Sequence, residues 1–566
     1  MRAILTISSF LFLLASYAQP FSLNWVRQAG NTGIDGIRAI KSDNAGNVFA
    51  AGWFTGTVDF DPGAGVYPLT GPGQRNMFIC KYAPSGAMLW AKAQTGDDRA
   101  SAIDIAIDQS GNVLTTGFFT GTVDFDPGPG TFTLTSSPGR FESFVSKLDP
   151  QGNFLWTAKF GYCALDYGAA ALKTDPQGNV LVTGIFEMTA DFDPGTGVHE
   201  MSASALESAF ILKLNSSGEF VWSRQINGAQ GVDIDTDPSG AVYASGHFLE
   251  TADLDPGPGT MSATSVGEID IYVLKLTAAG DFVWAKHFGG TLPDQVTTID
   301  VGQNGNIYLT GIYASEGVDF DPGTGVQHLP FHGWTDIFIT KLDPNGDFVW
   351  SKGFGGEEYD RVWALVLDGQ EQISMSGQFR VTVDFDPAGP GVYTLSSAGS
   401  GADDCFIARM DADGHFKWAA QLHGNMNYGL GIDLAPGNGL YLGGTFQNQT
   451  DFDPGPDAYT LSSPGGYSDG YLLRFTPDAT AELAEQQTGF QLSCFPNPFT
   501  ESLTVIHGAV SGNAMLSVVS SLGETVLKQA VTNAESTILS TGGLPAGMYF
   551  IRLDDGVAIS RAKVVK

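Results

Sequence analysis

The sequence has few cysteines and few basic residues. Its 566 residues include four cysteines, Cys80, Cys163, Cys405 and Cys494, which lie far apart and at no paired spacing. This spacing indicates neither a zinc site nor a disulfide framework. Lys and Arg number 28 against 61 Asp and Glu, which gives a formal charge of −33. Nucleic acids and anionic membrane surfaces are bound through basic patches, so we expect neither as a partner.

Long apolar segments are also scarce. The run Ile4 to Leu14 follows a basic residue at position 2 and precedes the small residues Ser16 and Ala18. A basic start, a short apolar run and small residues at this spacing are typical of a signal peptide. The run is too short to span a bilayer, which takes about 20 residues. We therefore predict a signal peptide over residues 1–18, a mature protein that begins near Gln19, and no transmembrane segment.

Glycine is abundant, with 73 residues, and the chain repeats itself. Three series recur at intervals of 62 to 68 residues, which is typical of a repeat architecture. The tetrapeptide Asp-Phe/Leu-Asp-Pro begins at Asp59, Asp124, Asp191, Asp253, Asp319, Asp384 and Asp451. A tryptophan recurs at Trp25, Trp90, Trp156, Trp222, Trp284, Trp350 and Trp418. An apolar run ends in a basic residue at Lys81, Lys147, Lys213, Lys275, Lys341, Arg409 and Arg474.

Each repeat contains four short stretches that predict β-strands. In one repeat these are Trp363 to Leu367, Gln372 to Ser376, Phe406 to Met410 and His415 to Gln421, all rich in β-branched or aromatic residues. Turns such as Asp343-Pro344-Asn345-Gly346 join the strands into hairpins. Seven units of four strands predict an all-β fold, a seven-bladed β-propeller.

The two ends of the repeat region distinguish a closed ring from an open solenoid. The strand Leu23 to Ala29 precedes the first complete unit, and the last unit, which ends at Phe475, has no Trp strand after it. A solenoid would need a polar capping repeat at each end, and none is present. We therefore predict that Trp25 lies on the outer strand of the blade that contains Tyr471, and that residues 19–477 form the ring.

The repeat resembles a known family. The stretch from Asp336 to Trp350, followed by Gly355-Gly356, and the stretch from Asp175 to Gly184 are similar to the bacterial SBBP β-propeller repeat. The resemblance covers about residues 21–477 and departs where the Asp-Phe-Asp-Pro-Gly segment lengthens each unit. It implies a propeller fold and a surface location.

The last part of the chain differs in composition. Residues 478–489 form a predicted linker rich in Ala, Glu and Gln, and residues 490–566 read as a second, smaller β domain. Phe495-Pro496-Asn497-Pro498-Phe499, the run Leu544 to Arg552 and the terminal Lys563 to Lys566 are similar to the type A C-terminal sorting domain of type IX secretion substrates. The resemblance implies an immunoglobulin-like sandwich, recognised by the type IX export machinery and removed near the linker. Release, or attachment to surface lipopolysaccharide, would follow. The alternative is an ordinary structural β-sandwich.

The Asp-Phe-Asp-Pro segments could hold metal ions. In an extended strand Asp59 and Asp61 share one face and Phe60 points the other way, so the Phe series should form wedges between blades. Two carboxylates and turn carbonyls could bind Ca²⁺. The alternative, which we favour, is that one Asp caps the turn and the other pairs with a basic residue such as Lys81.

No residue combination predicts a catalytic, cofactor-binding or metal site. The eight histidines recur at no shared position, and neither a nucleophile elbow nor a phosphate-binding loop is present.

Variable segments between repeats should instead gather on one face, where ligand binding usually occurs, and would suit a sugar, a cation or a basic protein. We expect a non-catalytic, secreted or cell-surface binding or adhesion protein. The alternative is a propeller enzyme acting on extracellular polysaccharide. The variable segments contribute Asp97, Asp98, Asp166, Tyr167, Asp294, Glu357, Glu358, Tyr359, Asp360 and Tyr428.

Overall fold

The computed structural model describes residues 21–477 and most of 492–566. The residues outside the description are 1–20, 62–64, 164–167, 204–206, 387–392, 398, 400, 456, 478–491, 496–498, 508–513, 521–524, 532–535, 546 and 555–558. The predicted signal peptide and linker therefore lie outside the described residues. The chain divides into two compact units, Phe21–Pro477 and a second unit that includes residues 478–566.

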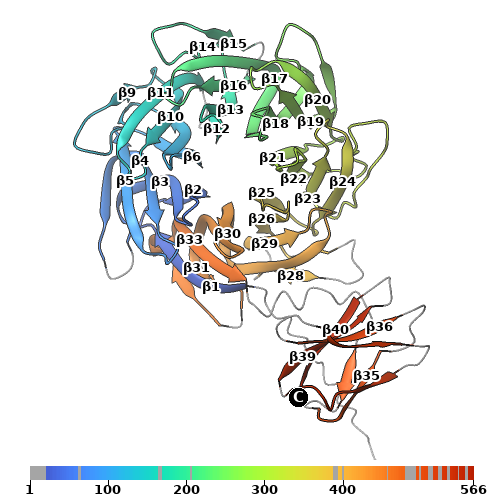
Figure 1. Cartoon of the computed structure of the whole chain (residues 1–566). Coiled ribbons are helices and arrows are strands. Elements are labelled where there is room, and N and C mark those ends of the chain that lie inside the picture. Colours follow the sequence, from blue (N-terminus) through green and yellow to red (C-terminus); the bar gives the residue numbers. More distant parts are fainter. Residues whose placement is uncertain are drawn as a thin grey trace, which may run out of the picture. The chain divides into compact units, whose positions relative to one another are not determined.

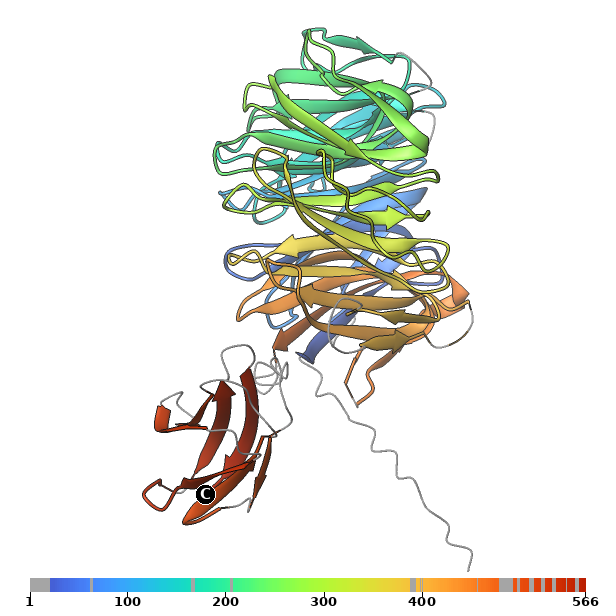
Figure 2. The same ribbon diagram turned by 90° about the vertical axis from the view of Figure 1, so that its right-hand side faces the viewer.

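The strands of the first unit pair into seven antiparallel groups of four, which we number as blades 1 to 7 around the ring (Figure 1). Figure 2 shows the same ring from its edge. Blade 1 comprises β2 (Gly36–Ser42), β3 (Val48–Asp59), β4 (Pro68–Tyr82) and β5 (Met88–Gly96). Blade 2 comprises β6 (Ala100–Ile107), β7 (Val113–Phe119), β10 (Phe141–Leu148) and β11 (Phe154–Cys163). Blade 3 comprises β12 (Ala169–Thr174), β13 (Val180–Phe186), β16 (Ser208–Leu214) and the first half of β17 (Phe220–Thr236).

The remaining blades follow the same order, from the inner strand outward. Blade 4 comprises the second half of β17, β18 (Val242–Asp253), β19 (Ser262–Leu276) and β20 (Phe282–Phe288). Blade 5 comprises β21 (Gln295–Val301), β22 (Ile307–Tyr313), β23 (Asp336–Leu342) and β24 (Phe348–Phe354). Blade 6 comprises β25 (Arg361–Leu367), β26 (Ile373–Phe379), β29 (Asp404–Met410) and the first half of β30 (Phe416–Ala435). Blade 7 comprises the second half of β30, β31 (Gly439–Asp451), β33 (Asp469–Pro477) and β1 (Phe21–Ala29).

Short elements lie between the main strands. They are β8 (Thr122–Asp124), β9 (Thr133–Thr135), β14 (Thr189–Asp191), β15 (Glu200–Ser202), β27 (Thr382–Asp384), β28 (Thr394–Ser396), β32 (Thr460–Ser462) and the 3-10 turn η1 (Pro464–Gly466).

The first strand closes the ring. β1 pairs with β33, with Trp25 opposite Arg474 and Gln28 opposite Tyr471. One buried cluster joins blade 7 to blade 1, with Tyr441 packed among residues that include Phe54. The predicted closure is confirmed, and the ring therefore depends on contacts between its first and last strands.

The outer-strand tryptophans hold neighbouring blades together. The indole Nε1 of Trp156 in blade 2 donates to the carbonyl of Ser216 in a turn of blade 3, at 3.2 Å. Gly218 in that turn has φ +84°, and a Cβ there would lie 2.8 Å from the Trp156 ring. The turn therefore needs glycine for both its backbone conformation and the close approach of the indole.

The strand ends and connections form two faces of the propeller. We call the connection face the one that holds the links between blades and the Asp-Phe-Asp-Pro segments, and the turn face the one that holds the tight turns. On the connection face the end of each of three outer strands pairs with an Asp-Phe-Asp-Pro segment: Thr95 with Asp124, Asn227 with Asp253, and His423 with Asp451. At these junctions the links between blades and the Asp-Phe-Asp-Pro segments therefore lie on the same face.

The Asp-Phe-Asp-Pro segments are self-contained turns. Asp124 Oδ1 accepts hydrogen bonds from the backbone N–H of Asp126 at 3.1 Å and of Phe132 at 2.8 Å. Asp126 Oδ1 accepts one from Gly128 N at 2.8 Å. Phe125 between them is fully buried, as are its equivalents, in agreement with the predicted wedges.

The prediction that the basic series neutralises these aspartates is wrong. Lys81 pairs with Asp43 at 3.3 Å, and Lys147 pairs with Asp108 at 2.9 Å. Asp43 begins the turn before β3, whereas Asp59 ends β3, so the two carboxylates lie at opposite ends of one strand. The basic side chains act at the turn face, where Lys147 also donates to the carbonyl of Ser216 in the next blade at 3.1 Å.

The second unit contains a small β-sandwich of two sheets. One sheet has the order β34 (Ser493–Phe495), β35 (Ser502–Ile506), β38 (Ser536–Ser540). The other has the order β37 (Thr525–Ala530), β36 (Met515–Ser520), β39 (Met548–Asp554), β40 (Ile559–Val565). Buried side chains such as Leu503, Val518 and Ile551 pack between the sheets. The Lys566 Nζ donates to the carbonyls of Thr541, Gly542 and Leu544 at 2.6 to 2.9 Å and so fixes the end of the last strand.

Candidate functional site

Two exposed aromatic side chains meet on the connection face. Trp334 lies in the segment before β23, and Tyr359 lies in the link between blades 5 and 6. Their side chains are 62% and 42% exposed. The ring centroids are 5.3 Å apart and the planes are inclined by 38°. The pair therefore presents a contiguous aromatic surface to solvent.

Backbone hydrogen bonds fix the two segments that carry these rings. Trp334 N donates to the carbonyl of Glu358 at 3.4 Å, and Asp360 N donates to the carbonyl of Thr335 at 3.1 Å. The Asp360 carboxylate is fully buried and accepts from Gly356 N at 2.6 Å and Arg380 N at 3.1 Å. Burial raises the pKa of Asp360 to about 7. Asp360 therefore anchors the link that positions Tyr359.

A polar network adjoins the rings. The Arg380 guanidinium lies 5.7 Å from the Tyr359 ring centroid and forms a two-point ion pair with Asp403, with Nη2 to Oδ2 at 3.1 Å. The Tyr428 hydroxyl donates to the same Asp403 Oδ2 at 3.1 Å. We call Trp334, Tyr359, Arg380, Asp403 and Tyr428 the aromatic patch. Its polar groups are ordered before any ligand binds, which lowers the entropic cost of binding.

The structure brings together part of the predicted connection-face set. Tyr359, Asp360 and Tyr428 are neighbours, with Glu357 and Glu358 on the same link. The remaining described members, Asp97, Asp98 and Asp294, lie in other links and accept hydrogen bonds from nearby backbone or hydroxyl groups. Asp166 and Tyr167 lie outside the described residues.

Sequence reasoning missed Trp334, Arg380 and Asp403. The sequence does carry a signal for Trp334, because seven of the ten tryptophans follow the repeat and Trp53, Trp334 and Trp363 do not. The periodic tryptophans serve the contacts between blades, which leaves the other three available for other roles.

The inner strands surround a central cavity of about 520 Å³. Most of its charged side chains have partners: Lys41 pairs with Asp433 at 3.0 Å and Lys173 with Asp235 at 2.9 Å. Asp104 Oδ2 accepts from Leu172 N in the next blade at 2.8 Å. These contacts join the inner strands of different blades, so these acids of the cavity wall stabilise the closed ring.

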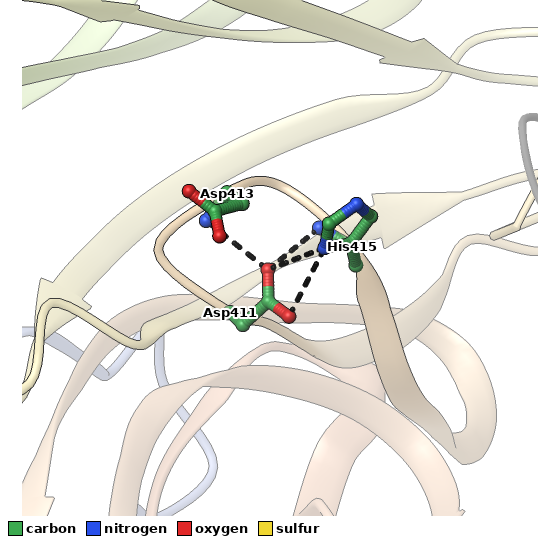
Figure 3. Close-up of side chains that lie close together, drawn as sticks. All are labelled: Asp411, Asp413 and His415. Carbon is green, nitrogen blue, oxygen red and sulfur yellow. Dashed lines mark hydrogen bonds and ion pairs between the residues drawn. The ribbon is translucent and has the colours of Figure 1, made fainter. Parts of the chain in front are cut away.

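Among the described residues, one group of side chains, Asp411, Asp413 and His415, brings metal-ligating atoms within 4.8 Å of one another (Figure 3). Asp411 Oδ1 accepts from Asp413 N at 3.1 Å and His415 N at 2.9 Å, and Asp411 also pairs with Lys417 at 3.3 Å. The same backbone pattern occurs at Asp149, which accepts from Gln151 N and Asn153 N. The group therefore fits the repeated tight turn and needs no ion to explain its geometry.

Comparisons with known proteins place the C-terminal part of the chain in a family. Residues 493–566 match the family described as "Secretion system C-terminal sorting domain". Among curated proteins, an uncharacterized WD repeat-containing protein of Acanthamoeba polyphaga mimivirus is 24% identical over 508 residues, covering 75% of this chain and 36% of that protein. The regulatory protein FlaEY of Caulobacter vibrioides is 24% identical over 315 residues, covering 52% of this chain and 31% of that protein. The chain thus spans about a third of the length of these relatives.

Among solved structures, PorZ, a surface component of the type IX secretion system of Porphyromonas gingivalis, is 10% identical. The alignment covers 94% of this chain and 81% of PorZ, with a TM-score of 0.26. In the described part of the chain no helix has the length and apolar character needed to cross a membrane. The chain is a type IX secretion cargo in which an all-β propeller precedes a C-terminal domain of the secretion-system sorting family.

Proposed function

We propose that the secreted propeller is a non-catalytic binding protein and that its aromatic patch holds a neutral glycan. The observation that carries this proposal is the exposed Trp334–Tyr359 pair beside the ordered Arg380–Asp403–Tyr428 network. Contiguous exposed aromatic surface on a soluble protein usually marks an interaction site. Binding residues are commonly placed on loops that a rigid scaffold supports, as these loops are.

The chemistry of the patch fits a sugar. Aromatic rings cover the apolar C–H faces of a pyranose, while Arg380 and Asp403 offer donors and acceptors for ring hydroxyls. The formal charge of −33, with Glu357 and Glu358 beside the rings, disfavours acidic polysaccharides at this surface. A neutral glycan has apolar faces and hydroxyl groups that fit the patch, and it carries no negative charge that the nearby acids would repel.

The alternative function is hydrolysis of an extracellular polysaccharide. A general acid must reach its substrate within hydrogen-bond distance. Asp360 has a raised pKa, but it is fully buried and both of its oxygens accept backbone hydrogen bonds. This arrangement supports a positioning role, and we therefore propose binding without turnover.

The test is a screen of the purified chain against neutral glycans that records binding and reducing-end release together. We expect saturable binding without product release, and at least tenfold weaker binding in Trp334→Ala. Tyr467→Ala is the matched control, because Tyr467 is 52% exposed and lies in another blade. Binding that Trp334→Ala leaves unchanged would contradict the proposed patch. Product release that one point substitution abolishes would identify an enzyme.

A further inference from the structure

Two bulged inner-strand residues, Arg38 and Trp363, line the central cavity near the connection face. The ladder of β2 shifts between Ile37 and Ala39, and that of β25 shifts between Val362 and Ala364. A β-bulge leaves one residue out of the ladder and re-aims its side chain. Arg38 of blade 1 thereby comes within 5.6 Å of the Trp363 ring of blade 6, across the inner strand of blade 7.

A second arginine contacts the same indole. The Arg361 guanidinium lies 4.1 Å from the Trp363 ring centroid. Within the described part of the chain, neither Arg38 nor Arg361 forms an ion pair, and the buried Arg361 Nε has no hydrogen-bond partner. Burial lowers the pKa of both arginines. The pKa of Arg361 falls to about 10, and the nearby positive charge of Arg38 is the second cause of that decrease. Two like charges therefore lie close together, and neither forms an ion pair with a described carboxylate.

The surroundings compensate this charge only in part. Asp104 attracts Arg38, but its Oδ2 already accepts from Leu172 N. His247 lies close enough for Arg361 to help lower its pKa to about 4, after burial, and so adds no negative charge. The other cavity cations differ, because Lys41 and Lys173 each have an aspartate partner. In a chain with a formal charge of −33, two neighbouring arginines that form no ion pair are an exception among the described cavity cations.

We infer that this end of the cavity binds a small carboxylate-bearing ligand. A guanidinium fork pairs with a carboxylate through two parallel hydrogen bonds, and Arg38 has donors available for this role. The Trp363 ring offers a flat apolar wall for the rest of the ligand. A volume of about 520 Å³ is within the range of small-molecule pockets. This site is separate from the aromatic patch and does not rest on the glycan proposal.

The test is isothermal titration of the full chain with acetate, benzoate and glucuronate at constant ionic strength, with glucose as the uncharged partner of glucuronate. We expect at least one acid to bind saturably at one site per chain, and we expect any heat from glucose to depend on Trp334 and not on Arg38. Arg38→Met should weaken that binding at least tenfold, and Arg38→Lys should give an intermediate loss, because it keeps the charge but not the fork. Arg99→Met is the control, since Arg99 is an exposed arginine that donates to Gln74.

A second readout does not depend on heats of binding. The bound acid should raise the melting temperature of the unmodified chain and leave that of Arg38→Met unchanged, because a ligand of the native state stabilises it by mass action. The absence of binding by all three acids would overturn the inference. So would binding that persists in Arg38→Met, or that disappears in Trp334→Ala, which would assign the acid to the aromatic patch.

Discussion

Replacing Trp25 by alanine tests the closure of the ring. Trp25 is 8% exposed, and its ring centroid lies 6.4 Å from that of Tyr82 and 6.0 Å from that of Tyr441. Its Nε1 also donates to the carbonyl of Pro84 at 3.0 Å. Truncation of a buried tryptophan costs about 3–5 kcal/mol through lost burial and the cavity that remains. We expect Trp25→Ala to lower the free energy of unfolding by this amount.

The matched control is Trp334→Ala, which removes the same side chain from an exposed site. Because Trp334 is 62% exposed, its loss should change stability by no more than about 0.5 kcal/mol. Urea unfolding followed by far-UV circular dichroism measures both variants without relying on tryptophan fluorescence. A loss below about 1 kcal/mol in Trp25→Ala, or equal losses in the two variants, would refute the reasoning that β1 closes the ring through this side chain.

Three further predictions concern charge. Lys341→Met should destabilise the chain by about 1–3 kcal/mol in the same assay, because it removes the ion pair with the buried Glu371 at 3.6 Å, and an unchanged midpoint would contradict this. Chelation with EDTA should leave the melting temperature unchanged, because Asp124 and Asp126 accept backbone N–H groups of their own turn; a loss of many degrees would reveal a structural cation. Stability should peak near pH 4–5. Burial raises the pKa of Asp294 and Asp360 to about 7, so stability falls as the pH rises from about 4 to 7, and unfolding midpoints that increase toward pH 8 would contradict this. Below pH 4 stability falls again, because hydrogen bonds from Asn179 and Lys213 outweigh burial and lower the pKa of Asp175.

The fold was predictable because each repeated residue series has the same structural role in every blade. The Trp series marks the outer strands, and the turn glycines are needed where indoles such as Trp156 pack. The partners of the Lys series were not predictable in the same way. Aspartates recur at both ends of each repeat, and spacing alone does not say whether Lys81 reaches Asp43 or Asp59. The antiparallel direction of the paired strands places Lys81 beside Asp43, and the residue spacing does not reveal this direction.

The candidate sites were less predictable, since they depend on contacts between repeats. Arg38 and Trp363 are 325 positions apart in sequence, yet bulges in β2 and β25 bring them together across blade 7. Trp334 meets Tyr359 because two links of irregular length pair through their backbones. Departures from the repeat were the available signal, as the three tryptophans outside the series show.

The acidity of the chain follows from its architecture more than from its ligand. A ring built from short strands has many turns, and turn N–H groups outside the ladders need acceptors. Asp149 supplies one at a tight turn, Asp124 at a connection and Asp104 between inner strands. Aspartate is therefore a poor marker of function in this chain. The basic residues are more informative, because the repeated Lys and Arg side chains act at the turn face. Arg38 and Arg361 instead contact the Trp363 ring and form no ion pair among the described residues. In a chain with few basic residues, an arginine that forms no ion pair is the best place to look for a ligand.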